Sequence, residues 1–265
     1  MSNLSFVTLL SYDYELAMQA IEHYYDIADE IILGIDIDRV TWSGNKFDFD
    51  EFGFDEFIKR VDVNGKINII RENFHTSQRP IDNDTSERRF LSQICKKGNW
   101  IIQIDADELV LNPKEFKAFM DENDEALDGC AIKGHWITVF KAFGDGKYLV
   151  IDAAGETDGK IFVGTKSQNS YTMCRDTNET AIQTPLRLLH VSWGRTREGL
   201  KQKLENWGHS KDFNTNAYLE MWDKVTLENY QSFVNLHPLY GPHWPKLKLV
   251  ELNHILNTQG EPNEI

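Results

Sequence analysis

Pairs of aspartates separated by one residue occur four times in the sequence, and one pair stands where a metal site is expected. Asp105 and Asp107 directly follow the apolar segment Trp-Ile-Ile-Gln-Ile of residues 100–104, which is typical of a buried strand. Two carboxylates that leave a strand together can hold a hard divalent cation, and that cation would offset the cost of burying their charge. The same aspartates could instead cap the helix expected after Pro113.

Two of the other pairs have different surroundings. Asp48/Asp50 and Asp82/Asp84 lie in polar stretches, which indicates solvated loop or helix-cap roles. A carboxylate pair is weak evidence by itself, because the chain has 42 acidic residues against 28 Lys and Arg. Position directly after a strand therefore favours Asp105 and Asp107 over Asp48/Asp50 and Asp82/Asp84.

The composition excludes several classes of partner. The 265 residues carry a formal net charge of −14, which disfavours binding to nucleic acid and to anionic membrane surfaces. No apolar run approaches the roughly 18 residues of a membrane span, and the N-terminus lacks the pattern of a signal peptide. The three cysteines have no disulfide-framework or metal-knuckle spacing. We therefore expect a cytoplasmic protein with no transmembrane segment.

The elements that must position these residues alternate in the first half of the chain. Hydrophobic patterning predicts strands at 4–10, 30–35, 66–71 and 100–104, separated and followed by helices at 14–25, 54–60, 85–97 and 113–122. This alternation is typical of βαβ units and predicts a mostly parallel sheet covered on both faces. Ligands of such sheets bind at the carboxyl ends of the strands, where Asp105 and Asp107 stand.

The second half has a different pattern. Strands are expected at 130–140, 147–151, 160–163 and 187–191, with a helix at 198–207 and an irregular tail over the last 30 residues. No linker separates the halves, so we expect one domain over 1–265. Its nucleotide-binding half would be 1–128, and its acceptor-binding half with a C-terminal helical tail would be 129–265.

Several segments carry a resemblance to a known family. Residues 98–108, GNWIIQIDADE, resemble the DXD segment of GT-A glycosyltransferases, most closely family 2. Residues 4–36 resemble that family's first βαβ unit, and residues 188–213 are similar to a C-terminal segment of some members. The resemblance covers roughly residues 4–212. It implies a GT-A fold, in which a Rossmann-like, mostly parallel nucleotide-binding sheet is joined to a mixed acceptor-side half and C-terminal helices.

The resemblance implies a metal site for Mn²⁺ or Mg²⁺. Asp107 would be the direct ligand, and Asp105 would lie near the metal or the donor ribose. His190 follows an apolar run, and an imidazole there could complete a metal shell of carboxylate and phosphate oxygens. A lone histidine at a strand end is also often a structural residue.

The resemblance also implies donor contacts. Ser11 and Tyr12, after the first strand, would lie against the base or ribose, and Asp36 would contact the nucleoside. Arg88 could touch the diphosphate, although it could equally be a surface arginine paired with a neighbouring acid. Lys203 lies in the basic stretch 187–211 and could hold the leaving diphosphate, or it could be part of a solvated helix face.

An inverting transferase needs a carboxylate base for the acceptor hydroxyl. Glu179 is our first candidate, with Asp158 and Glu156 behind it, and each could instead be a loop carboxylate. Trp193 and Trp136 are candidates for stacking on an acceptor sugar, although core packing is the usual role of a tryptophan.

The combined prediction is a hexosyl- or pentosyltransferase of glycan biosynthesis. It would move a sugar from a UDP-, GDP- or dTDP-sugar to a hydroxyl of a glycan or glycoconjugate, with inversion and with a divalent cation. A nucleotidyltransferase or other nucleotide-sugar-processing enzyme is the main alternative, but the segment 9–14 lacks the Gly- and basic-rich loop that such an enzyme needs after its first strand. An aspartyl-nucleophile phosphatase would need its motif after the first strand, and a non-catalytic carbohydrate-binding protein would leave the strand-end carboxylates unexplained.

Overall fold

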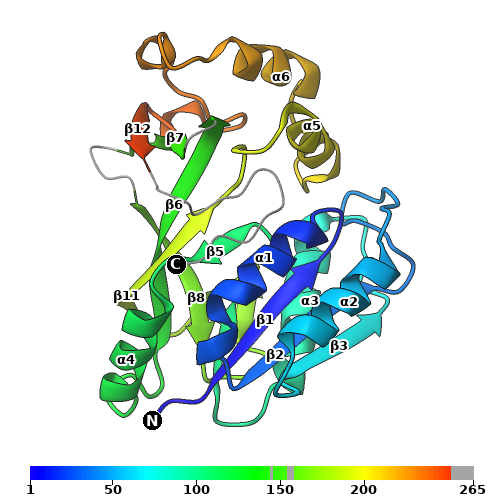
Figure 1. Cartoon of the computed structure of the whole chain (residues 1–265), viewed down its shortest axis with the longest axis vertical. Coiled ribbons are helices and arrows are strands. Elements are labelled where there is room, and N and C mark those ends of the chain that lie inside the picture. The colour runs from blue at the N-terminus through cyan, green and yellow to red at the C-terminus, as the bar shows by residue number, and fades with distance from the viewer. Residues whose placement is uncertain (144–145, 154–157, 252–265) are drawn as a thin grey trace. The chain divides into compact units, whose positions relative to one another are not determined.

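The computed structural model describes residues 1–143, 146–153 and 158–251. The chain forms two compact units (Figure 1). The first comprises Met1–His135, Lys160–Leu188 and Asn206–His209, and the second comprises Trp136–Gly159, Leu189–Glu205 and Ser210–Ile265. Strands β6 (Ala131–Phe143) and β11 (Ala181–His190) run from one unit into the other.

The first unit is built on a parallel sheet. Its strands are β1 (Leu4–Leu10), β2 (Glu30–Asp36), β3 (Ile67–Glu72) and β4 (Trp100–Gln103), in the order β4-β1-β2-β3. All residues of β1 and β4 are buried, as expected of central strands that are covered on both faces. Strand β8 (Asp158–Thr165) pairs antiparallel with β4. The predicted fold class, α/β with a mostly parallel Rossmann-like sheet, is confirmed.

Four helices accompany this sheet: α1 (Tyr14–Tyr24), α2 (Glu51–Val61), α3 (Pro80–Ile94) and α4 (Pro113–Asn123). In Figure 1, α1 and α2 lie in front of the sheet and α3 lies behind it. Helix α2 begins three residues earlier than expected, at Glu51, and Asp50 has the cap role considered for it, because its side chain accepts a hydrogen bond from the backbone N–H of Gly53. Helix α3 begins five residues earlier than expected, at Pro80, whose fixed φ suits a first helical position. Thr85 therefore lies inside the helix, where its hydroxyl donates to the carbonyl of Ile81.

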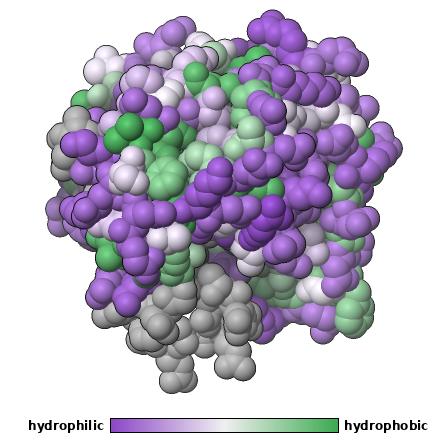
Figure 2. Space-filling model, turned by 90° about the horizontal axis from the view of Figure 1, so that it is seen from above, coloured by the Kyte–Doolittle hydropathy of each residue, from purple (hydrophilic) through white to green (hydrophobic). Residues whose placement is uncertain are grey.

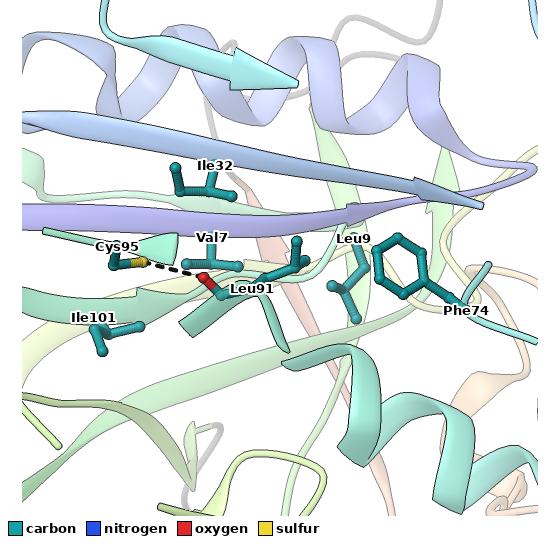
Figure 3. Packing of buried hydrophobic residues seen from close by; sticks show 7 residues of the cluster. All are labelled: Val7, Leu9, Ile32, Phe74, Leu91, Cys95 and Ile101. Carbon is teal, nitrogen blue, oxygen red and sulfur yellow. Dashed lines mark hydrogen bonds between the residues drawn. The ribbon is translucent and has the colours of Figure 1, made fainter. Parts of the chain in front are cut away.

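A cluster of buried side chains fixes α3 to the sheet (Figure 3). Leu91 and Cys95 pack against Val7, Ile32 and Ile101 of the strands. The Cys95 thiol is buried and donates to the carbonyl of Leu91 at 3.6 Å. This packing sets the height of α3 along the strands, and therefore the position of the polar residues on its buried face.

Three short strands of the first unit are not predicted from the sequence. Strands β9 (Tyr171–Met173) and β10 (Asp176–Thr177) form a two-stranded antiparallel ladder. Strand β5 (Glu108–Val110) pairs with β11, and the N–H of Leu111 donates to the carbonyl of Arg187.

The second unit combines antiparallel strands with helices. Strand β7 (Lys147–Ile151) pairs with β6 and with β12 (Leu247–Glu251), so part of the tail expected to be irregular is a strand. The buried run of β7 explains this difference, because a further strand completes its hydrogen bonds. Helices α5 (Arg197–Asn206) and α6 (Thr215–Lys224) and two 3₁₀ turns, Tyr230–Ser232 and Gly241–His243, complete the unit.

The surface is consistent with the composition. The face shown in Figure 2 is dominated by hydrophilic side chains, with separate apolar patches between them. Among the described helices, none is long and apolar enough to cross a bilayer.

Candidate functional site

The ends of three neighbouring parallel strands form one edge of the sheet, here called the carboxyl edge. The register pairs Leu10 with Ile35 and Val7 with Gln103. Ser11 therefore follows β1 beside the end of β2 at Asp36, and Asp105 follows the end of β4 on the other side. The structure thus brings the predicted donor and metal residues of the first unit to one edge.

The segment Asp105–Glu108 forms a closed turn at this edge. The backbone N–H of Asp105 donates to Oε2 of Glu108 at 2.9 Å, and the N–H of Glu108 donates to the carbonyl of Asp105 at 3.0 Å. The Glu108 side chain is completely buried. Glu108 thereby fixes the turn that carries both aspartates.

Arg175, on the β9–β10 hairpin, is the residue of this site that the sequence does not reveal. Its guanidinium donates to both carboxylate oxygens of Glu108 at 2.7 and 2.8 Å and to the carbonyl of Gln103 at 3.1 Å. It also lies 3.6 Å from Oδ2 of Asp105. A buried carboxylate needs a cation, but Glu108 in the sequence does not say which basic residue supplies it.

Arg88 supplies a second cation from α3. It is almost completely buried, and it donates to Oδ1 of Asp84 at 2.6 Å and to Oδ1 of Asp105 at 2.7 Å. The expected pairing with acidic residues is therefore present, but the expected surface position is wrong because Arg88 is buried. The expectation that Asp84 is a solvated loop or cap residue is wrong, because Asp84 is buried on α3 as a partner of Arg88.

These arginines determine the ionisation of Asp105. Burial acts to raise the pKa of Asp105, but the guanidinium groups of Arg175 and Arg88 outweigh it and hold the pKa at about 2. The Asp105 side chain remains 31% exposed, whereas Asp107 is buried. From the sequence, we expected a metal ion to offset the negative charge of these carboxylates. In the structure, the guanidinium groups of Arg88 and Arg175 offset part of that charge.

The two carboxylates still offer the hard oxygen donors that Mg²⁺ and Mn²⁺ prefer. In the part of the chain that the structure describes, no group of three His, Cys, Asp or Glu side chains is arranged as a metal site. The residues therefore fit a cation held by one or two carboxylates together with substrate phosphates, which is a usual arrangement for Mg²⁺. The third predicted metal ligand, His190, belongs to the second unit.

Asp36 has a different environment from Asp105. Its Oδ1 accepts the backbone N–H groups of Asp38 and Val40, and its Oδ2 accepts those of Phe74 and His75, at 2.8–3.2 Å. A carboxylate has about four lone-pair sites, so these four bonds use its accepting capacity. Asp36 therefore holds two loops together, and a nucleoside contact would have to displace one of these bonds.

Ser11 and Tyr12 lie between β1 and α1 at the carboxyl edge, and the carbonyl of Ser11 accepts the N–H of Tyr14. Lys203 lies on α5 in the second unit, where its ammonium group is 5.5 Å from the ring centre of Trp193. Lys203 is buried, so the solvated helix face considered for it is wrong.

The predicted acceptor tryptophans are both in the second unit. Trp193 is 1% exposed and packs against Tyr218 and Trp244, so core packing describes it. Trp136 stacks on His190, with ring centres 4.1 Å apart and planes within 4° of parallel. The imidazole of His190 therefore occupies one face of the Trp136 ring and is held in orientation by it.

The structure describes the three candidate bases to different extents. The Glu179 carboxylate accepts the hydroxyls of Thr165 and Ser167, and Thr165 pairs with Ile101 near the amino end of β4. Glu179 is thus held away from the carboxyl edge, where Asp105 lies. Asp158 begins β8, and Glu156 lies outside the described residues.

Comparisons with known proteins leave the family open. No protein-family model matches the chain, and no curated protein is similar to it in sequence. Similar solved structures include mannose-6-phosphate isomerase from Helicobacter pylori, with 11% identity and a TM-score of 0.32 over 57% of this chain and 56% of the isomerase. Others are 4-diphosphocytidyl-2C-methyl-D-erythritol synthase (10% identity, TM-score 0.36, 62% of this chain and 76% of that chain) and S. aureus TarS 1-349 (10% identity, TM-score 0.36, 88% and 78%).

Proposed function

We propose that the protein is a metal-dependent glycosyltransferase that moves a hexose or pentose from a UDP-, GDP- or dTDP-sugar to a hydroxyl of a glycan or glycoconjugate, with inversion. The observation that supports this most directly is the carboxylate pair Asp105 and Asp107 on a braced turn at the carboxyl edge. The low pKa of Asp105 and its partial exposure suit a group that must be ionised and reachable. We expect the enzyme to act in the cytoplasm, in glycan biosynthesis.

The donor would bind along this edge. Asp107 and Asp105 would hold Mn²⁺ or Mg²⁺ against the diphosphate, and the bound cation would stabilise the negative charge of the leaving group. Ser11 and Tyr12 would lie against the base or ribose, since they follow the neighbouring strand. Arg88 and Arg175 keep the Asp105 carboxylate ionised and oriented.

The second unit would contribute the remaining groups. We propose that His190 is a further metal ligand and that Lys203 contacts the leaving diphosphate. The acceptor hydroxyl must lose its proton to a carboxylate within hydrogen-bond reach. Glu179 remains the first candidate for this base, with Asp158 and Glu156 behind it, and its carboxylate would have to release the hydroxyl of Thr165 or Ser167 to accept the proton.

Thermal shift with Mn²⁺ and a panel of UDP-, GDP- and dTDP-sugars tests the donor site, because a specific ligand stabilises the folded state. We expect a metal-dependent shift with one donor class that Asp107→Ala abolishes. Asp55→Ala, at an exposed position of α2, is the matched control and should keep the shift. Absence of any metal-dependent shift with every donor would contradict the proposal.

Product analysis separates the main alternative. A glycosyltransferase releases a nucleoside diphosphate from the donor, whereas a nucleotidyltransferase consumes a nucleoside triphosphate and releases pyrophosphate. Pyrophosphate release from UTP, GTP, CTP or dTTP with a sugar phosphate, without transfer from any nucleotide sugar, would favour the nucleotidyltransferase.

A further inference from the structure

A pocket of about 370 Å³ lies entirely within the second unit, between α6 and the segment 233–238. None of the predicted site residues lines it. Its size is at the lower end of the range for small-molecule sites, which is about 300–1,000 Å³. It therefore has room for a ring-sized group.

The pocket combines aromatic walls with neutral polar groups. Phe213, Tyr218 and Phe233 supply the aromatic rings, and aliphatic side chains complete the apolar surface. Asn214 and Asn235 supply two amides, so the described lining can donate and accept hydrogen bonds. None of these lining residues is Asp, Glu, Lys or Arg, although the chain as a whole has 26% charged residues.

The walls are held in place by the unit's own hydrogen bonds. The Tyr218 hydroxyl donates to the carbonyl of Leu236 at 2.8 Å, which ties α6 to the opposite wall. The Asn214 side chain caps α6 by accepting the N–H of Ala217 at 3.0 Å. Asn235 has a left-handed backbone with φ of 56°, which is uncommon for a residue other than glycine. The pocket is therefore formed before any ligand binds.

The imidazole of His237 is held in place by backbone hydrogen bonds. Its Nδ1 accepts the backbone N–H groups of Leu239 and Tyr240 at 3.2 and 3.0 Å. Nδ1 is therefore the accepting nitrogen of the ring, and Nε2 is its other polar atom. His237 thus adds an imidazole to the two amides among the lining residues.

We propose that this pocket binds an uncharged sugar ring. Aromatic side chains provide an apolar surface for the C–H face of a sugar, and amide and imidazole groups hydrogen-bond to its hydroxyls. A phosphate or carboxylate ligand would lack a cation among the lining residues. The ring belongs to the acceptor glycan rather than to the nucleotide donor, and this last step rests on the proposed glycosyltransferase function.

Saturation-transfer NMR on the full chain, without donor or metal, tests the pocket. The probes are maltose, lactose and N,N′-diacetylchitobiose as neutral sugars, glucose 6-phosphate as a charged sugar and benzyl alcohol as a purely apolar ring. We expect saturation of the C–H protons of at least one neutral disaccharide, with little for glucose 6-phosphate or benzyl alcohol.

Two variant pairs locate the binding. Val234→Asp places a charge on the lining at a position that is 56% exposed, and its match is Val63→Asp, which is 75% exposed in the first unit. Phe233→Ala is matched by Phe52→Ala, at an exposed position of α2. We expect the two pocket variants to weaken sugar binding by about tenfold or more, and both controls to bind as the wild type does.

The outcomes separate this proposal from the donor site. If the protein shows the donor-dependent thermal shift but binds no neutral sugar, the proposed sugar site in the pocket is wrong and the proposed transferase function stands. Sugar binding that both pocket variants retain, or benzyl alcohol bound in place of sugars, would also overturn it. Sugar binding that Val234→Asp removes, in a protein without any donor shift, would support the pocket as a carbohydrate site and overturn the transferase.

Discussion

Strands β2 and β4 each have an aspartate at or just beyond the carboxyl end, and the structure gives the two carboxylates different partners. Asp36 ends β2 and accepts four backbone N–H groups from two loops. Asp105 follows β4 and pairs with the side chains of Arg88 and Arg175. The first carboxylate organises backbone, and the second is braced by side chains while remaining 31% exposed.

This difference shows that a strand-end aspartate is not a ligand site by position alone. Backbone donors in two loops lose their partner together when the carboxylate is removed, so the local chain must rearrange. Arginines that have other acidic partners can keep those partners when one carboxylate is lost. The number and kind of partners therefore predict whether a substitution at each end affects folding or function.

Asp36→Ala should have the largest effect on stability. It leaves four backbone N–H groups at the end of β2 without their acceptor, and hydrogen bonds to a charged group contribute about 1.5–3 kcal/mol each, not additively. We expect a loss of about 4 kcal/mol in the free energy of unfolding, measured by urea denaturation. Asp38→Ala, at the exposed neighbour, should change it by less than about 0.5 kcal/mol. If the two variants lowered the free energy of unfolding equally, the structural role assigned to Asp36 would be wrong.

The sequence was sufficient for the parallel sheet and for the position of Asp105 and Asp107, because both follow from strand periodicity and the order of elements. It was not sufficient for the partners of those aspartates. Arg88 lies on a predicted helix, but its burial depends on the packing of Leu91 and Cys95 against the sheet. Arg175 reaches the site from a hairpin more than 60 residues away in the chain, and no local pattern marks it.

The β4 end can be tested through Arg175→Met. This change leaves the Glu108 carboxylate completely buried without its bidentate partner, and breaking a buried pair costs about 3–5 kcal/mol. We expect a loss of about 3 kcal/mol, with part of it recovered in the double variant with Glu108→Gln. Arg60→Met removes an exposed ion pair with Glu22 and should cost less than about 1 kcal/mol. A double variant no more stable than Arg175→Met would contradict the pairing with Glu108.

Glu87 lies on α3, the helix that also carries Arg88 and Asp84, and it should make the stability of the protein depend on pH. Burial raises its pKa to about 8, and the hydrogen bond from Nε1 of Trp42 lowers it only in part. The folded state therefore holds a proton that the unfolded state releases near its ordinary pKa, so stability from this group falls as the pH rises towards 8. Relative to Glu87→Gln, the wild type should lose about 2 kcal/mol between about pH 6 and about pH 8. Parallel stability curves for the two proteins over this range would show that Glu87 is ionised in the folded state.

Asp105→Asn should have the smallest effect on stability and a decisive effect on donor binding. Because the pKa of Asp105 is lowered in the folded state, the ionised carboxylate stabilises the folded protein. This contribution is present above about pH 4 and is lost as the pH falls towards 2. Because the side chain is 31% exposed, we expect a cost of only about 1 kcal/mol at neutral pH. Arg88 keeps Asp84 and Arg175 keeps Glu108, so the turn stays closed. The variant should nevertheless lose the metal-dependent thermal shift, whereas Asp36→Asn should destabilise the protein more than Asp105→Asn does. If Asp105→Asn were the more destabilising of the two, the carboxylate of β4 would be the architectural one and the difference between the strand ends would be reversed.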